Sequence, residues 1–120
     1  MAESGSRIVA QVQFDMRVEE MPFVVVCLDV SDSSEQRSQS LGAHRAYVDG
    51  HAEMIIMSGP LLDDEGVTRS GQLFVLDVAD LGSAEAFVKN DPFMNDGVFE
   101  KVIIRRFAPI IADGTRRAFL

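Results

Sequence analysis

The apolar run PFVVVCLD, residues 22–29, is the strongest structural signal in the sequence. Six apolar residues lie between Pro22 and Asp29, and the run is short, β-branched and aromatic, which predicts a β-strand. Because side chains alternate along a strand, both of its faces are apolar. The strand therefore needs cover on both faces, as strands buried inside a protein do.

The segments that follow predict a β-α-β-β-α-β order. A Ser-Asp-Ser-Ser cluster at 31–34 caps a helix from Glu35 to about Gly50. Ser83 is expected to cap a second helix that stops before Pro92. The remaining strands are expected at 53–62, 71–78 and 102–107, with a hairpin loop at 63–70. This order is ferredoxin-like, an α+β fold in which two helices pack on one face of an antiparallel sheet.

Such a sheet leaves the second face of the first strand without cover in a single chain. The simplest solution is a homodimer, or a higher homo-oligomer, packed sheet against sheet. The length of 120 residues and the 47% hydrophobic content support one core. We expect an N-terminal arm at 1–20, one domain at 21–110 and a C-terminal tail at 111–120.

Composition excludes several classes of protein. The net charge of −8 repels phosphate backbones and anionic lipids, so nucleic acid and membrane are not expected partners. A single cysteine, Cys27, and two poorly spaced histidines give no metal site. No apolar stretch is long enough to span a bilayer and no export signal is visible, so a cytoplasmic location is expected.

His44 and Asp91 are the leading catalytic candidates. His44 continues an apolar helical stripe with Leu41 and Val48, and Asp91 continues the stripe of the second helix, so both are expected to point inward. Buried polar groups need partners, and the two are expected to bind each other. As a dyad, the carboxylate would orient the imidazole for proton transfer. The alternative is a structural staple between the helices.

The chain resembles YciI-like (YCII-related) proteins over roughly residues 22–109. The resemblance rests on the order and spacing of Asp29, Arg37, His44, the Ser58-Gly59-Pro60 turn, Asn90-Asp91-Pro92-Phe93, Gly97 and Val98. It implies a dimeric α+β barrel without a cofactor and an active site built from His44 and Asp91. It also implies that some relatives are lyases acting on chlorinated or hydroxylated aromatic breakdown products.

Further residues are candidates for binding a small-molecule substrate. Ser58 could donate a hydrogen bond from the turn formed with Gly59 and Pro60, although a small residue is also simply required there. Asp29 and Arg37 could line the pocket rim or form a local salt bridge. Phe93 would shape the pocket.

Three functions remain open. The first is a cofactor-free lyase-, isomerase- or hydrolase-like enzyme that uses the dyad for acid-base chemistry on a small, possibly aromatic-derived, substrate. The second is a non-catalytic small-molecule-binding or accessory dimer. The third is a cofactor-independent monooxygenase.

Overall fold

The computed structural model describes residues 17–116 of the chain. The expected N-terminal arm and C-terminal tail lie partly outside this range. In chain order the elements are η1 (Val18–Glu20), β1 (Phe23–Asp29), α2 (Ser34–Gly50), η2 (Ala52–Met54), β2 (Ile55–Leu62), β3 (Arg69–Leu76), α3 (Leu81–Lys89), α4 (Pro92–Asn95), β4 (Phe99–Arg106), β5 (Ile111–Ala112) and β6 (Thr115–Arg116).

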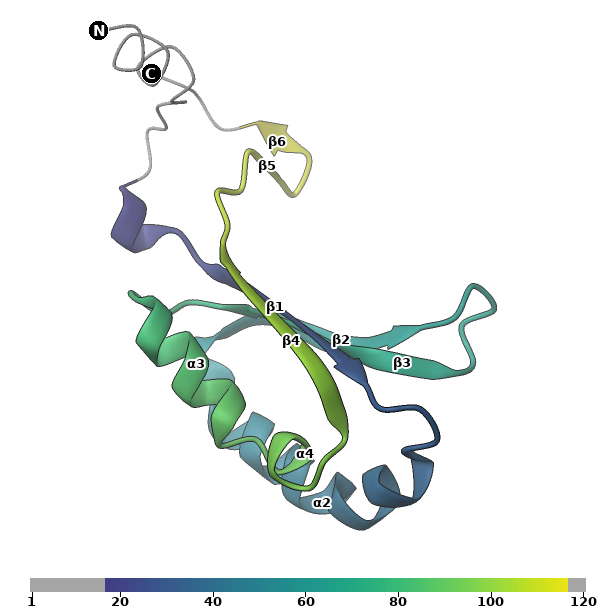
Figure 1. Cartoon of the computed structure of the whole chain (residues 1–120). Helices are drawn as coiled ribbons and strands as arrows, with labels where there is room; N and C mark the ends of the chain where they lie inside the picture. Colours follow the sequence, from purple (N-terminus) through teal and green to yellow (C-terminus); the bar gives the residue numbers. More distant parts are fainter. Residues whose placement is uncertain (1–16, 117–120) are drawn as a thin grey trace, which may run out of the picture.

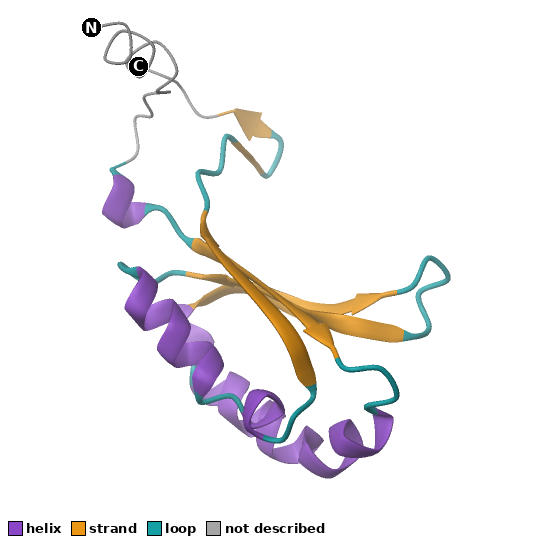
Figure 2. Cartoon of the chain, in the orientation of Figure 1, coloured by secondary structure: helices purple, strands orange, loops and turns teal. Residues whose placement is uncertain are grey.

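The four long strands form one antiparallel sheet in the order β2-β3-β1-β4. Helices α2, α3 and α4 all lie on one face of this sheet (Figures 1 and 2). The predicted α+β fold with an antiparallel sheet is confirmed, and β1 lies inside that sheet. Its cause is the apolar run of β1, which pairs on one edge with β3 and on the other with β4.

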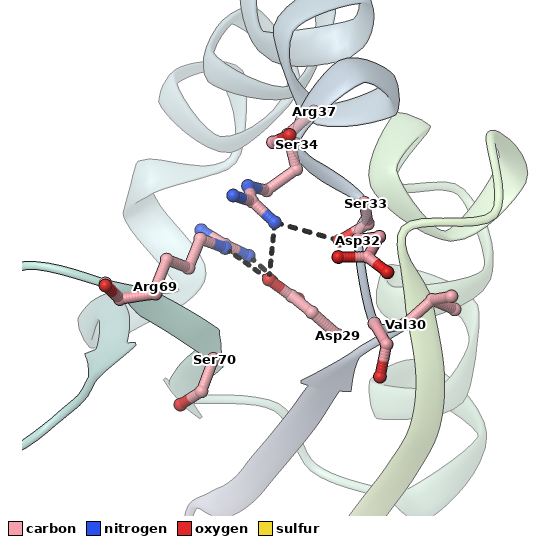
Figure 3. A pocket seen from close by; sticks show the side chains of 10 residues that line it. Asp29, Val30, Asp32, Ser33, Ser34, Arg37, Arg69 and Ser70 are labelled. Carbon is pink, nitrogen blue, oxygen red and sulfur yellow. Dashed lines mark hydrogen bonds and ion pairs between the residues drawn. The ribbon is translucent and has the colours of Figure 1, made fainter.

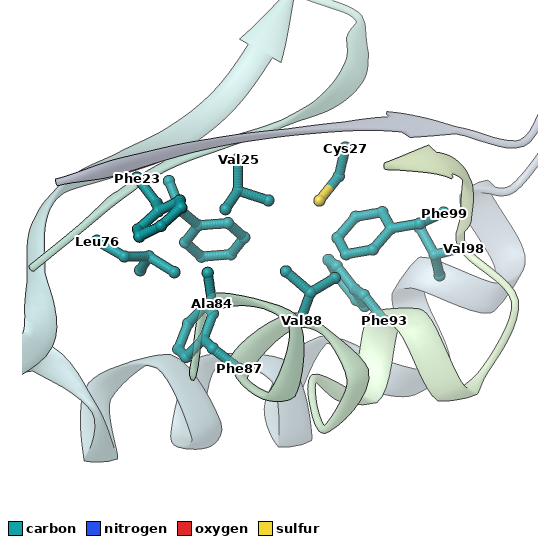
Figure 4. Packing of buried hydrophobic residues seen from close by; sticks show 11 residues of the cluster. Phe23, Val25, Cys27, Leu76, Ala84, Phe87, Val88, Phe93, Val98 and Phe99 are labelled. Atoms are coloured by element: carbon teal, nitrogen blue, oxygen red, sulfur yellow. The ribbon is translucent and has the colours of Figure 1, made fainter. Parts of the chain in front are cut away.

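The core fills the space between the helices and the sheet. Phe23, Val25 and Cys27 alternate along β1 and are all buried on the helix-covered face. They meet side chains from β3, α3, α4 and β4 (Figure 4). These partners are Phe74, Leu76, Ala84, Phe87, Val88, Phe93, Val98 and Phe99. Fully burying a side chain of this size contributes about 1.5–3 kcal/mol, so this layer holds the helices on the sheet.

The opposite face of the sheet is apolar and only partly buried. Val24 and Val26 of β1 pair there with Val75 and Leu73 of β3, and Ile103 of β4 continues the surface. Within residues 17–116 no helix covers this face (Figure 1). The prediction that β1 is apolar on both sides therefore leaves a surface that the single chain does not bury.

Three local predictions were wrong. The cap of α3 is Asp80, whose side chain accepts a hydrogen bond from the Ser83 backbone amide, so Ser83 is not the cap. Asp91 does not lie on the stripe of α3; it is the N-cap of α4, and Pro92 is the first residue of that helix. Ser58, Gly59 and Pro60 form no turn, because they lie inside β2, which continues to Leu62. The proline is tolerated there since β2 is an edge strand.

The C-terminal segment expected to be a loose tail contains a small hairpin. Strands β5 and β6 pair across Asp113 and Gly114, which both adopt positive φ angles. An Asp-Gly pair with positive φ at both positions is typical of the tight turn that closes a two-residue hairpin. The Asp113-Gly114 pair is therefore the signal in the sequence for this hairpin.

Candidate active site

His44 lies on the inner face of α2 and contacts two residues from the start of α4. Its Nδ1 lies 2.7 Å from Oδ1 of Asp91. Its ring stacks on Phe93, with centroids 3.8 Å apart and planes 4° from parallel. The side chains of His44 and Asp91 are 8% and 0% exposed. The predicted contact between the two is therefore present, and the imidazole is held in one orientation by a bond at its edge and a stack on its face.

The Asp-Pro sequence explains how Asp91 comes to face His44. As the N-cap, Asp91 accepts a hydrogen bond from the Phe93 amide at 2.9 Å, using the same Oδ1 that contacts His44. Pro92 favours this helix start because its ring fixes a helical φ and it has no amide hydrogen to satisfy. The cap thus aims the carboxylate inward at α2.

The second oxygen of Asp91 makes no hydrogen bond. Among the described residues, Oδ2 of Asp91 is the only fully buried side-chain oxygen or nitrogen without a partner. Leaving a carboxylate oxygen in this state costs on the order of 1–3 kcal/mol, and such groups concentrate at functional sites.

The free nitrogen of His44 is accessible. Nδ1 is taken by Asp91, and Nε2 makes no hydrogen bond within residues 17–116. Nε2 is also not one of the fully buried unpartnered atoms. It therefore keeps some contact with solvent, although the His44 side chain as a whole is only 8% exposed. In the neutral ring, an Nδ1–H donating to the carboxylate leaves Nε2 as the proton acceptor, which is the arrangement needed for a general base.

The larger cavity lies at the N-terminal end of α2 and has a volume of about 360 Å³. It is polar, with the charged side chains of Asp29, Arg37 and Arg69 on its wall (Figure 3). Neither His44 nor Asp91 lines it. Its full lining is Asp29, Val30, Ser31, Asp32, Ser33, Ser34, Arg37, Thr68, Arg69 and Ser70.

A buried carboxylate organises this cavity. The Asp29 side chain is 4% exposed and pairs with Arg69, whose Nε donates to Oδ2 at 2.8 Å, and with Arg37, whose Nη1 donates at 3.4 Å. Arg37 also donates to Ser33 Oγ at 2.8 Å, and Arg69 donates to Gln72 Oε1 at 2.9 Å. The salt bridge between Asp29 and Arg37, one of the two predicted alternatives, is therefore present, and both residues also line the cavity. The shorter ion pair of Asp29, with Arg69, was not predicted.

The two sites are connected through Phe93. The guanidinium carbon of Arg69 lies 5.1 Å from the centroid of the Phe93 ring, and His44 stacks on that same ring. On α2, Arg37 and His44 are separated by two turns, with Ser40 between them hydrogen-bonded to Asp96. Arg37 and His44 thus lie on the same helix, and Arg69 and His44 both contact the Phe93 ring.

The remaining predicted binding residues are arranged differently. Ser58, Gly59 and Pro60 lie within edge strand β2 rather than in a turn after it, and the large cavity does not include them. Phe93 is fully buried, so it supports His44 rather than offering a free surface.

The other histidine and the cysteine occupy separate environments. His51 lies beside a second, more open cavity of about 250 Å³ with Tyr47 and Phe87. Burial, together with the nearby charge of Asp91, raises the pKa of the Cys27 thiol to about 12, so it is no nucleophile at neutral pH. In the described part of the chain, no group of three His, Cys, Asp or Glu side chains could hold a metal ion. No helix there has the length and apolar character to cross a bilayer.

Comparison with known families identifies the fold. The model of the YCII-related domain matches residues 21–108. This chain belongs to the YCII-related family. A comparison with curated proteins finds no match.

A solved structure extends this result. The chain is similar to the 5-chloro-2-hydroxyhydroquinone dehydrochlorinase of Burkholderia phenoliruptrix AC1100, in complex with 2,5-dihydroxybenzoquinone. The identity is 28%, the TM-score is 0.66, and the match covers 73% of this chain and 94% of the other. The fold of this YCII-related chain is therefore that of the dimeric α+β barrels.

Proposed function

We propose that this chain is a cofactor-free, lyase-like enzyme in which His44, oriented by Asp91, moves a proton on a small, hydroxylated, aromatic-derived substrate. The observation that carries the proposal is the dyad itself: Nδ1 is held at 2.7 Å by a buried carboxylate while Nε2 is unbonded and not sealed from solvent. The similar dehydrochlorinase supports the reaction class and the kind of substrate.

In an elimination, Nε2 would take a proton from a substrate carbon or hydroxyl as the leaving group departs with its bonding electrons. Asp91 would stabilise the resulting imidazolium, and it would act through His44 because it has no exposed surface. Arg37 and Arg69, held by Asp29, would bind the substrate. Phe93 would hold the imidazole ring in its plane. Ser58 stays a predicted contact on the helix-facing side of β2.

A homodimer is part of this proposal. The uncovered face of the sheet carries Val24, Val26, Leu73, Val75 and Ile103. Burying apolar surface of this kind contributes about 25 cal/mol per Å², which favours sheet-to-sheet pairing of two copies. Light scattering should give twice the 13.2 kDa chain mass, or more, at micromolar concentration. A mass of one chain would remove this part of the proposal.

The test of function is a turnover assay on chlorinated and unchlorinated hydroxyquinols, followed by the ultraviolet spectrum and by chloride release. The His44→Gln variant should lose at least about a hundredfold in rate, the usual contribution of a placed general base. His51→Gln is the matched control, because it removes the other histidine of the same helical segment. Its rate should stay within about twofold of the parent.

A non-catalytic ligand-binding dimer is the second candidate, favoured by the observation that neither His44 nor Asp91 lines the larger cavity. It predicts ligand-dependent thermal stabilisation with no product. Oxygen uptake with the same hydroxyquinols would instead indicate the cofactor-independent monooxygenase. Equal rates in the parent and His44→Gln would disprove the dyad mechanism.

A further inference from the structure

We propose that Arg37 and Arg69 form a recognition site for a delocalised oxyanion, so that the substrate binds as an anion: a carboxylate or a deprotonated hydroxyquinone. The proposal rests on the proposed function and defines the charge class of its substrate. It assigns a role to Arg69, which no sequence signal indicated.

The two guanidiniums are fixed before any ligand arrives. Asp29 accepts from both of them, and its side chain is 4% exposed, so it is not available to a ligand. One carboxylate between two guanidiniums leaves a net positive charge on the trio. Asp32 also lines the cavity, but it is exposed and forms no ion pair with either arginine, so water screens its charge.

Arg37 has the larger number of unused hydrogen-bond donors, because all three guanidinium nitrogens of Arg69 already make one bond each and leave one N–H on each Nη. A guanidinium has five N–H groups in a fork that matches two oxygens of one anion. Of the three nitrogens of Arg37, only Nη1 makes hydrogen bonds within the described residues, to Asp29 and Ser33. Its Nε and Nη2 are therefore available, and the Arg37 and Arg69 side chains are 23% and 16% exposed.

The surroundings of the arginines also suit an anion. Five hydroxyl side chains line the cavity, namely Ser31, Ser33, Ser34, Thr68 and Ser70. The cavity opens at the first turn of α2, where backbone amides point outward, and the N-cap hydroxyl of Ser33 accepts from Arg37 instead of capping them. These groups add hydrogen-bond donors beside the guanidiniums.

The position of Arg69 connects the anion to the chemistry. Its guanidinium lies over Phe93, and the Phe93 ring stacks on His44. Arg37 precedes His44 by seven residues on one face of α2, which is about 10 Å along the helix axis. Arg37 is therefore linked to His44 through α2, and Arg69 is linked to it through the Phe93 ring. Because the whole chain carries a net charge of −8, this local positive site is needed to attract an anion.

Isothermal titration with a matched pair of ligands tests the proposal. The pair is 2,5-dihydroxybenzoquinone, whose hydroxyls ionise, and its dimethyl ether, whose oxygens cannot. Benzoate and benzamide form a second pair. The parent protein should bind each anion at least about tenfold more tightly than its neutral analogue, which corresponds to 1.4 kcal/mol. The preference should shrink as salt is added.

Arg69→Gln and Arg37→Gln should each remove most of this preference, and Arg69→Lys should restore part of it because the charge remains. Arg45→Gln is the matched control, because Arg45 is an exposed arginine of α2 outside the cavity. Circular dichroism checks that each variant is folded. Should Arg69→Gln fail to fold, the Arg37→Gln and Arg69→Lys variants still decide the question.

The proposal is overturned if the parent binds anionic and neutral analogues equally, if it binds neither anion, or if the preference survives in the folded arginine variants. His44→Gln separates this proposal from the proposed function. An arginine-dependent preference without any His44-dependent turnover would uphold the anion site and reject the enzyme. Turnover that needs His44 but is insensitive to both arginines would do the reverse.

Discussion

Asp29 and Asp91 are both nearly sealed from solvent, with side chains 4% and 0% exposed, yet the structure treats them differently. Asp29 is surrounded by cations, and both of its oxygens accept hydrogen bonds. Asp91 faces one imidazole and one backbone amide through a single oxygen, and its other oxygen has no partner. A carboxylate whose two oxygens are both hydrogen-bonded, such as Asp29, holds its neighbours in place. Asp91 has one oxygen without a partner, so it can accept a further hydrogen bond if His44 gains a proton.

The largest expected loss of stability comes from a substitution at Gly71 in β3. A Cβ at Gly71 would lie 2.1 Å from the Cys27 carbonyl oxygen, so Gly71→Ala must push β3 away from β1. Arg69 and Asp29 stand at that end of the two strands, and their contact should break. We expect a loss of at least about 3 kcal/mol in the free energy of unfolding, measured by urea denaturation.

Gly59→Ala is the matched control for that substitution. Gly59 also lies in a strand, but no atom lies within 4 Å of its added Cβ. Its stability should change by less than about 0.5 kcal/mol, with a gain as the expected sign. Similar losses in both variants would show that strand glycines as such, and not the β1–β3 contact, carry the effect.

The second prediction concerns Asp91. Asp91→Ala removes the cap of α4 and leaves Nδ1 of His44 unpaired, so it should cost about 2–4 kcal/mol. Asp91→Asn keeps an oxygen for both contacts and should cost no more than about 1 kcal/mol, while still impairing turnover because the imidazolium loses its charge partner. Urea denaturation and the hydroxyquinol assay measure the two effects. Equal losses of stability in both variants would contradict the described bonding of Oδ1.

The third prediction concerns the stability loss when Asp29 is replaced by alanine. Asp29→Ala should cost about 1–3 kcal/mol, less than Asp91→Ala, because the freed arginines can turn to solvent through the cavity. The loss should shrink in about 1 M salt, where the Debye length is about 3 Å. The loss for Asp91→Ala should not shrink, since its partners are buried. A salt-independent loss at Asp29 would mean that its ion pairs contribute nothing.

The last prediction concerns Cys27, whose pKa depends on the charges of both regions. Burial raises its pKa from 9.0 to about 12, with Asp91 and Asp29 adding to the rise and Arg69 opposing it. Below about pH 9 the thiol is protonated in both states; above it only the unfolded chain loses the proton, so stability falls as the pH rises. The slope is up to about 1.4 kcal/mol per pH unit. Urea denaturation at rising pH should show a shallower fall in Cys27→Ala, and equal slopes would contradict the shifted pKa.

The sequence predicted the contact of His44 with Asp91 but not the role of Arg69 in the proposed anion site. His44 and Asp91 could be paired in advance because each is a polar residue at a position expected to be buried. Arg69 offers no such sign, since a charged residue beside a polar loop is ordinary. A register shift between Leu61 and Leu62 changes the pairing of β2 with β3 next to Arg69. Arg69 contacts Gln72 of its own strand and Asp29 of β1, and the contact with Gln72 is one that simple alternation along a strand does not predict.

The sequence by itself determined the α+β fold, the central strand, the apolar second face and the partnership of His44 with Asp91. The fold and the inward position of His44 follow from hydrophobic periodicity, which is a property of neighbouring residues. The pairing with Asp91 follows from the need of a buried histidine for a polar partner, because Asp91 itself does not lie on the stripe of α3. Only the tertiary structure decided that Asp91 caps α4, that Oδ2 lacks a partner, and that Arg69 reaches Asp29 across 40 residues of sequence. Those outcomes depend on the strand register and on the residue at which α4 starts. A shift of one residue in the register would turn a side chain to the other face of the sheet, and a shift in the helix start would move the cap away from Asp91.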